Sequence, residues 1–144
     1  MISDVRSYFD AVLKAENLKE HDDAFAVDNI ARVNFNNSYH VIYTIPAVTE
    51  ANDTMYIDQQ SWTIQLGFKG FRKPQDALDN AMDISHTIRE NLMLPSSITA
   101  FNAGKDYPIL KISNNSIVAE PVESNDNSIV VTLEFNLQRA FNNC

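Results

Sequence analysis

The segment from Ser61 to Leu94 constrains the fold most, because its hydrophobic period changes from that of a strand to that of a helix across one short turn. Over residues 61–68 every second position is apolar, which predicts a strand with one buried face: Trp62, Ile64, Leu66 and Phe68. From residue 77 to 92 the apolar positions recur three and four apart, as on one face of a helix. Pro74 suits a first helical position and Pro95 prevents continuation, so we expect a helix over Pro74–Leu94.

The turn between this strand and this helix is basic. Lys69, Arg72 and Lys73 lie in it, and no acidic residue occurs between Gln59 and Gln75. The chain as a whole has 11 basic and 19 acidic residues, for a formal net charge of −8. The turn is therefore a candidate contact surface for an acidic partner. The alternative is an ordinary solvated connection between strand and helix.

A second amphipathic helix is predicted at the start of the chain, over Ser3–Asn17. Its apolar residues follow the helical template, with Ser3 as the N-cap: Val5, Tyr8, Phe9, Val12 and Leu13. Residues 19–23 form a charged connector in this interpretation. Residues 24–37 fit a strand as well as a short helix, and only a turn near Asn37 is predicted there.

The remaining segments are predicted as strands. β-Branched and aromatic residues indicate a strand over Tyr39–Ile45, ended by Pro46, and strict alternation indicates the last strand over Ile129–Gln138. Between Pro95 and the last strand we expect three shorter strands, with turns at Asn114-Asn115 and Asn125–Asn127: Ile98–Phe101, Tyr107–Ile112 and Ser116–Val122. A short tail would follow Arg139.

The strands around Val41 and Trp62 most simply pair as an antiparallel hairpin, which leaves a loop of about a dozen residues, Ala47–Asp58. Loops of this length are commonly mobile or functional. This one has the composition of a docking site, with acids around an exposed pair: Glu50, Asp53 and Asp58 around Met55 and Tyr56. The alternative is a mobile tip without a partner.

These elements predict one domain, residues 1–144, of the α+β class. We expect an antiparallel-dominated sheet with two helices packed on one face, in the order α-β-β-α-β-β-β, which does not count the short segment Ile98–Phe101. The hydrophobic fraction of 44% and the charged fraction of 21% indicate an ordinary folded core. No repeat or low-complexity tract divides the chain.

The sequence contains no recognisable catalytic, cofactor or metal motif. Its three glycines form no phosphate-binding loop, and its three histidines, His21, His40 and His86, have no partner at a ligand spacing. Cys144 is the only cysteine, so an intrachain disulfide is excluded. The first residues do not form a signal peptide, so we expect a protein made in the cytosol that is not an enzyme and needs no cofactor or metal.

The pattern from Met1 to Arg139 resembles the tail terminator proteins of long-tailed bacteriophages. The resemblance is one of architecture, size and strand texture: an amphipathic first helix, a long-looped hairpin, the helix with Ala77, Leu78, Ala81, Ile88 and Leu92, and a closing strand over Val131–Arg139. It implies a homohexameric ring, possibly monomeric when free, that caps the tail tube, ends its polymerisation and contacts the head connector. The mature protein would lie in the virion, at the head-proximal end of the tail.

In such a ring, Lys69, Arg72 and Lys73 would meet the acidic hairpin of a neighbour, and DNA would pass through the lumen without specific binding, which suits a net negative protein. Three alternatives stay open. They are another phage neck or minor tail protein, a small ligand-binding or regulatory α+β module, and an enzyme whose site comes from scattered residues.

Overall fold

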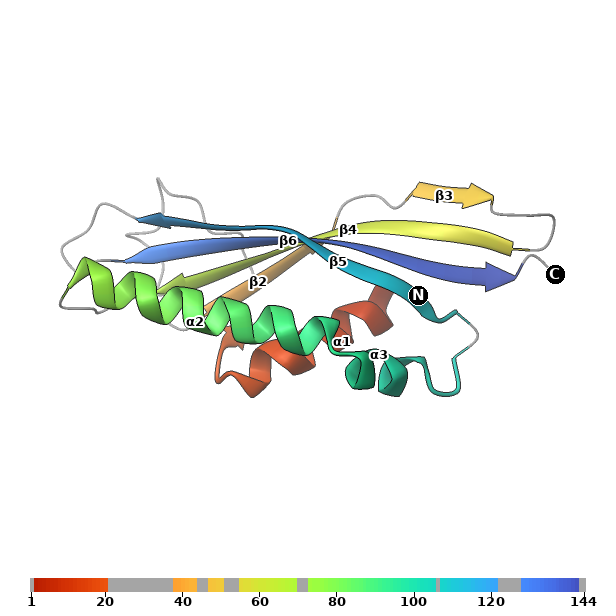
Figure 1. Cartoon of the computed structure of the whole chain (residues 1–144), viewed down its shortest axis with the longest axis horizontal. Helices are drawn as coiled ribbons and strands as arrows, with labels where there is room; N and C mark the ends of the chain where they lie inside the picture. Colours follow the sequence, from red (N-terminus) through yellow and green to blue (C-terminus); the bar gives the residue numbers. More distant parts are fainter. Residues whose placement is uncertain are drawn as a thin grey trace.

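The fold was analysed in a computed structural model, which describes residues 2–20, 38–43, 47–50, 55–69, 73–105, 107–121 and 128–142. In this part of the chain, three helices lie on one face of a six-stranded, mostly antiparallel sheet (Figure 1). The α+β class predicted from the sequence is confirmed at this level. The predicted order of elements is wrong, because the described elements follow one another as α-β-β-β-β-α-α-β-β.

Two long central strands organise the sheet. β4 (Met55–Phe68) and β6 (Ile129–Asn142) pair antiparallel along their whole length, from Met55 opposite Asn142 to Phe68 opposite Ile129. β5 (Ile109–Pro121) pairs with the outer side of β6. β2 (Ser38–Tyr43) and β3 (Ala47–Glu50) both pair with the other side of β4, end to end along it.

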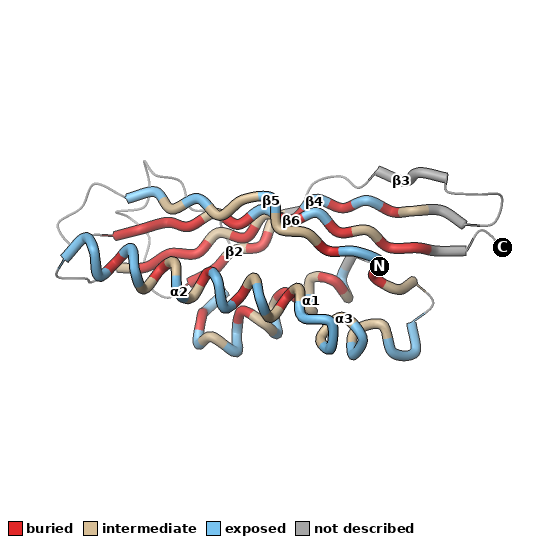
Figure 2. Tube along the Cα trace, in the orientation of Figure 1, coloured by how far each residue is buried: buried red, intermediate tan, exposed pale blue. Residues whose placement is uncertain are grey.

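The core lies between this sheet and the helices α1 (Ile2–Ala15) and α2 (Pro74–Met93). The sequence periodicities predicted most of it correctly, since the alternating apolar residues of β4 and β6 and most of the apolar stripes of both helices are buried, with Leu78 of α2 exposed (Figure 2). Phe9 of α1 lies 5.0 Å from the Trp62 ring and 6.1 Å from the Phe135 ring, between centroids. The small residues Ala77 and Ala81 are fully buried, which lets α2 approach the sheet closely.

One predicted strand is a helix. Residues 98–101 belong to α3 (Pro95–Asn102), which follows α2 after a single residue, Leu94. Pro95 ends α2 as expected, but it also occupies the first turn of the next helix, for which its fixed φ is suited. Ile98 and Phe101, three residues apart, pack together against the core, a spacing that fits a helix better than a strand.

The predicted turn at Asn114-Asn115 is also wrong. β5 is continuous through this point, and the extra residue is absorbed as a register shift against β6 between Asn114 and Ser116. The Asn114 side chain stabilises the irregularity, because its Nδ2 donates to the backbone oxygens of Ser116 and Glu134. An asparagine pair that is typical of turns here forms a β-bulge.

The predicted dozen-residue hairpin loop is mostly sheet. β3 occupies Ala47–Glu50 and pairs with residues 56–59 of β4, so only residues 51–54 connect the two strands. β6 extends to Asn142 instead of ending in a tail after Arg139, because it pairs with this first part of β4. The prediction of an irregular, unpaired loop over Ala47–Asp58 is therefore wrong for its described residues.

Three smaller differences concern the N-terminal region. Lys19–Glu20, placed in a connector, form the short strand β1, which pairs parallel with β2 and makes the sheet mixed. α1 begins at Ile2, so Ser3 lies inside the first turn and is not the N-cap. The helix ends at Ala15, and Asn17 beyond it has a positive φ of 61°. The predicted turns at 37 and 125–127 and the unassigned residues 24–37 lie outside the described residues.

Candidate interaction surfaces

The basic turn lies at one end of the molecule, where β4 leads into α2. Lys69 follows the last residue of β4 and is half-buried, whereas Lys73 is exposed at the N-terminal end of α2. Arg72 lies outside the described residues. Lys73 makes no capping hydrogen bond and is exposed, so it is accessible to a partner.

The acidic hairpin lies at the other end of the same strand. Glu50 is the last residue of β3, and Met55 and Tyr56 begin β4, where their backbones pair with Asn142 and Phe141 of β6. The side chains of these three residues, and all of Asp53, lie outside what the structure describes. Their role in contacts with a partner therefore stays a prediction.

Asp58 does not belong to this candidate surface. Its side chain is only 4% exposed and lies on the helix-facing side of β4, directly opposite Arg139 of β6. It accepts a hydrogen bond from Gln60 Nε2 at 2.7 Å, and Gln60 Oε1 accepts one from Trp62 Nε1 at 2.9 Å. Asp58 Oδ1 has no hydrogen-bond partner. Asp58 is thus part of a buried polar row that continues the apolar face of β4, not a docking acid.

The two predicted surfaces cannot contact each other within one chain. They lie at opposite ends of β4, a strand of 14 residues that spans roughly 40 Å at about 3.3 Å per residue (Figure 1). Contact between a basic turn and an acidic hairpin would therefore need a second copy, placed head to tail.

The middle of the sheet face opposite the helices is polar in the described residues. Cross-strand register aligns residues of β4, β6 and β5 in rows on this face: Gln59, Gln138 and Lys111, then Ser61, Asn136 and Ser113, then Thr63, Glu134 and Ser116. The first two rows line a hollow of about 320 Å³. These rows hold one cation and one anion, so the face offers no cationic patch for a phosphate backbone.

The outer edge of β5 is closed to strand pairing near its start. The amide of Asn102, the last residue of α3, donates from Nδ2 to Ile109 O at 3.0 Å, and its Oδ1 accepts from Ile109 N at 2.7 Å. The side chain thus occupies the place of a neighbouring strand. Two register shifts, around Leu110 and Asn115, interrupt the edge further. Such features prevent edge-to-edge association, so contacts between copies through β5 are disfavoured.

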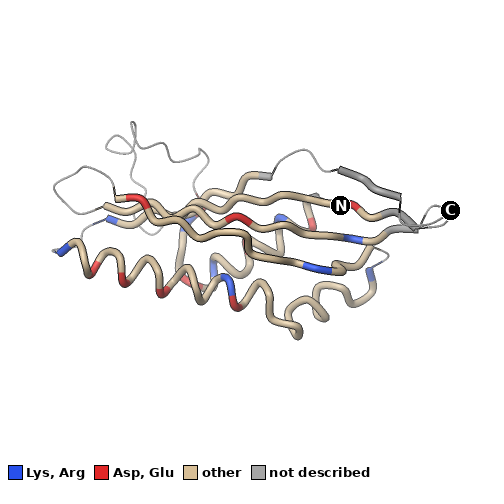
Figure 3. Tube along the Cα trace, turned by 45° about the horizontal axis from the view of Figure 1, so that its top comes forward, with Lys and Arg blue, Asp and Glu red and all other residues tan. Residues whose placement is uncertain are grey.

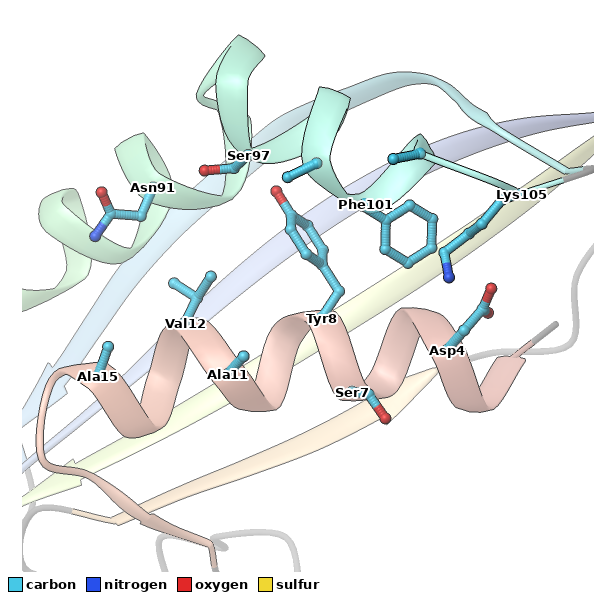
Figure 4. A pocket seen from close by; sticks show the side chains of 12 residues that line it. Asp4, Ser7, Tyr8, Ala11, Val12, Ala15, Asn91, Ser97, Phe101 and Lys105 are labelled. Carbon is cyan, nitrogen blue, oxygen red and sulfur yellow. The ribbon is translucent and has the colours of Figure 1, made fainter.

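A groove lies between α1 and α3, with the end of α2 as part of its wall. Its volume is about 780 Å³. Figure 4 shows the Tyr8 ring of α1 beside the Phe101 ring of α3, with ring centroids 5.4 Å apart. Burial raises the pKa of Tyr8 to about 12, and its hydroxyl donates to Leu92 O. The tyrosine is therefore a neutral, fixed part of the wall.

One end of the groove is held by a buried arginine. Arg139 is 1% exposed and donates from both terminal nitrogens to the Asp4 carboxylate, at 2.9 and 3.0 Å, and from Nε to Tyr107 O at 2.9 Å. Its guanidinium carbon also lies 5.4 Å from the Phe101 ring centre. Burial raises the pKa of Asp4, but the hydrogen bond and charge of Arg139 outweigh it and hold that pKa below its ordinary value. Arg139 thus joins β6, α1 and the segment after α3.

A scan against protein-family models finds no match, and no curated protein is significantly similar to the chain. No helix in the described ranges is long and apolar enough to cross a membrane. Within those same ranges, no group of three or more histidine, cysteine or acidic side chains is placed to hold a metal ion.

Sequence reasoning did not identify the groove, the Asn102 contact or the Arg139 network. The groove depends on α3, which was predicted as a strand, and the helical spacing of Ile98 and Phe101 after Pro95 was the only local signal for it.

The sequence did contain one indication for Arg139. It follows Phe135 and Leu137 at alternate positions of the last strand, so its side chain lies on the same buried face as theirs. A charged residue at a position predicted to be buried needs a partner, and Asp4 is that partner.

Proposed function

We propose that this chain is a structural virion protein that assembles as a head-to-tail ring, caps the tail tube of a long-tailed bacteriophage, and ends tube polymerisation. In this proposal the ring has six copies and sits at the head-proximal end of the tail. Its partners are the tail-tube protein on one side and the head connector on the other. DNA passes through the lumen without specific binding.

The observation that carries the proposal is the separation of the basic turn from the hairpin with Glu50, at opposite ends of an elongated subunit (Figure 1). Lys69 and Lys73 lie at one end of β4, and the hairpin with Glu50 lies at the other. A subunit with different, complementary ends associates head to tail, and such association yields a ring when the rotation between copies closes. The closed β5 edge supports contacts through side chains instead of sheet edges.

The neutral, polar sheet face is compatible with a ring that DNA traverses. A channel wall rich in lysine and arginine would bind the phosphate backbone and slow its passage. The net charge of −8 likewise disfavours binding of the DNA phosphate backbone by the protein as a whole.

The direct test is tube polymerisation with purified components. The protein is added to polymerising tail-tube subunits of the same phage, and tube lengths are measured by negative-stain electron microscopy. A terminator shortens the length distribution in proportion to its concentration and leaves a cap at one end. Unchanged tube lengths across that series would sink the proposal.

A second candidate is a small ligand-binding or regulatory module, which the groove between α1 and α3 favours. Its volume of about 780 Å³ is within the range of small-molecule sites, and its walls are mainly apolar. The two candidates differ in oligomeric behaviour. A protein that stays monomeric by sedimentation velocity at every concentration, and in the presence of tube ends, would favour the ligand-binding module.

A further inference from the structure

The groove between α1 and α3 has the shape and lining of a site for a helix. Most of its lining is apolar, and four of its residues are alanines from α1 and from α3 with the turn after it: Ala11, Ala15, Ala100 and Ala103. Small side chains let two helices approach closely. The α1 wall runs from Asp4 to Ala15, which is roughly 16 Å or three helical turns.

The charge at the rim of this groove is positive. Asp4 at one end is neutralised by Arg139, and Lys105 lies at the same end, as Figure 4 shows. Lys105 is exposed, with its ammonium nitrogen 4.6 Å from the Phe101 ring centre, and it makes no ion pair within the described residues. The groove therefore suits a helix that has an apolar residue toward the alanines and an acidic residue toward Lys105.

The first half of α2 has this chemistry and extends beyond the other helices (Figure 1). Leu78 is 39% exposed although it is a leucine of the predicted apolar stripe, and Met82, one turn later, is half-buried. Asp79 and Asp83 are exposed next to them, and Figure 3 shows acidic residues recurring along this helix. Leu78 and Asp79 therefore form a small apolar and acidic surface.

This surface cannot reach the groove of its own chain. Leu78 precedes Asn91, the α2 residue of the groove wall, by 13 positions, which is roughly 20 Å along a rigid helix. The contact is available only to a second copy. The same second copy would bring its basic turn, next to the start of α2, toward the hairpin end of the first.

We propose that the first half of α2 in one copy docks in the α1/α3 groove of the next copy, with Leu78 against the alanines and Asp79 near Lys105. This interface rests on the proposed ring function and names its main contact. Because the two surfaces differ, the contact is heterologous: each copy offers its helix to one neighbour and its groove to the other.

Site-specific cross-linking tests this contact. The native Cys144 is replaced by serine, and Leu78→Cys and Ala11→Cys are introduced alone and together. After assembly on tail-tube ends, a short bis-maleimide cross-linker is added and the products are separated by denaturing electrophoresis. Leu78→Cys with Ser61→Cys, on the opposite face of the sheet, is the matched control.

The interface predicts that only the Leu78→Cys/Ala11→Cys variant gives a ladder of multiples, which ends at the closed ring. The two single variants, mixed with each other, give dimers and nothing larger. Rings seen by electron microscopy without cross-links would overturn the interface and leave the terminator proposal standing. A ladder of cross-linked multiples without any effect on tube length would support the interface and contradict the terminator proposal. If the double variant gives cross-linked dimers and no larger product, the contact is two-fold and the head-to-tail interface is contradicted.

A charge exchange provides a second measurement on the same contact. Lys105→Glu places two like charges together and should weaken association by about tenfold or more. Adding Asp79→Lys to that variant restores an opposite pair at every interface and should recover most of the loss. Circular dichroism checks that each variant is folded. Equal association of the wild type and the Lys105→Glu variant would contradict the placement of Asp79 against Lys105.

Discussion

Replacing Asp4 by alanine tests the role of the buried Arg139 in holding α1 to the sheet. The substitution removes both carboxylate oxygens that accept from the guanidinium and leaves its positive charge at a site that is 1% exposed. Breaking a buried ion pair from one side costs about 3–5 kcal/mol of folding free energy. Since Asp4 itself is 30% exposed, water can partly replace it, and we expect the lower end, about 3 kcal/mol.

Urea unfolding followed by circular dichroism measures this loss, with ΔG taken by linear extrapolation. Ser3→Ala, on the same helical turn but exposed, is the control and should change stability by less than about 0.5 kcal/mol. The double variant Asp4→Ala/Arg139→Met removes the stranded charge, so it should be more stable than Asp4→Ala alone. If Asp4→Ala lowers the free energy of unfolding by less than about 1 kcal/mol, the reasoning is refuted. The contacts of Arg139 with Tyr107 and Phe101 would then be sufficient to hold it in place.

Three further predictions concern Asp4, Asn102 and the basic turn. Because the folded-state pKa of Asp4 is lowered, its contribution to stability is present above about pH 4 and is lost as the pH falls through that pKa. In Asp4→Asn the free energy of unfolding should therefore depend less on pH in this range, as acid unfolding would measure. Asn102→Ala leaves the backbone N–H and C=O of Ile109 unpaired, which should lower stability by about 1–3 kcal/mol and increase thioflavin-positive aggregation on mild heating. Lys69→Glu with Arg72→Glu should abolish rings in electron micrographs while circular dichroism shows that the protein is folded; normal rings would place the interface elsewhere.

The parts of the fold that the sequence predicted are those in which one face of an element is buried. Alternation in 61–68 and 129–137 and most of the helical stripe from Ala77 to Leu92 follow directly from that burial, and the structure confirms them except at Leu78, which is exposed. The errors occur where burial is partial. Residues 98–101 are only half-buried or exposed, so α3 has a weak pattern, and its existence depends on Pro95 and on packing with α1.

Pairing between distant strands explains the other errors. The ends of β4 and β6 are held as strands by each other, far apart in the sequence, and β3 is held by residues 56–59 of β4. No local period marks the limits of these strands. The Asn114 bulge depends on a hydrogen bond to Glu134 O, 20 residues away, which local turn statistics do not contain. Among candidate contact residues, Lys73 is exposed as expected, whereas Asp58 is buried because its strand continues past the predicted loop.

The most direct measurement of the proposed function is the copy number and symmetry of this protein on the end of a tail tube. Cryo-electron microscopy of tubes grown in its presence can determine both, with tubes grown alone as the control. The head-to-tail arrangement predicts one ring of six copies at one end, in which the α2 of each copy enters the α1/α3 groove of the next. Bare tube ends, or copies related by two-fold axes, would contradict it.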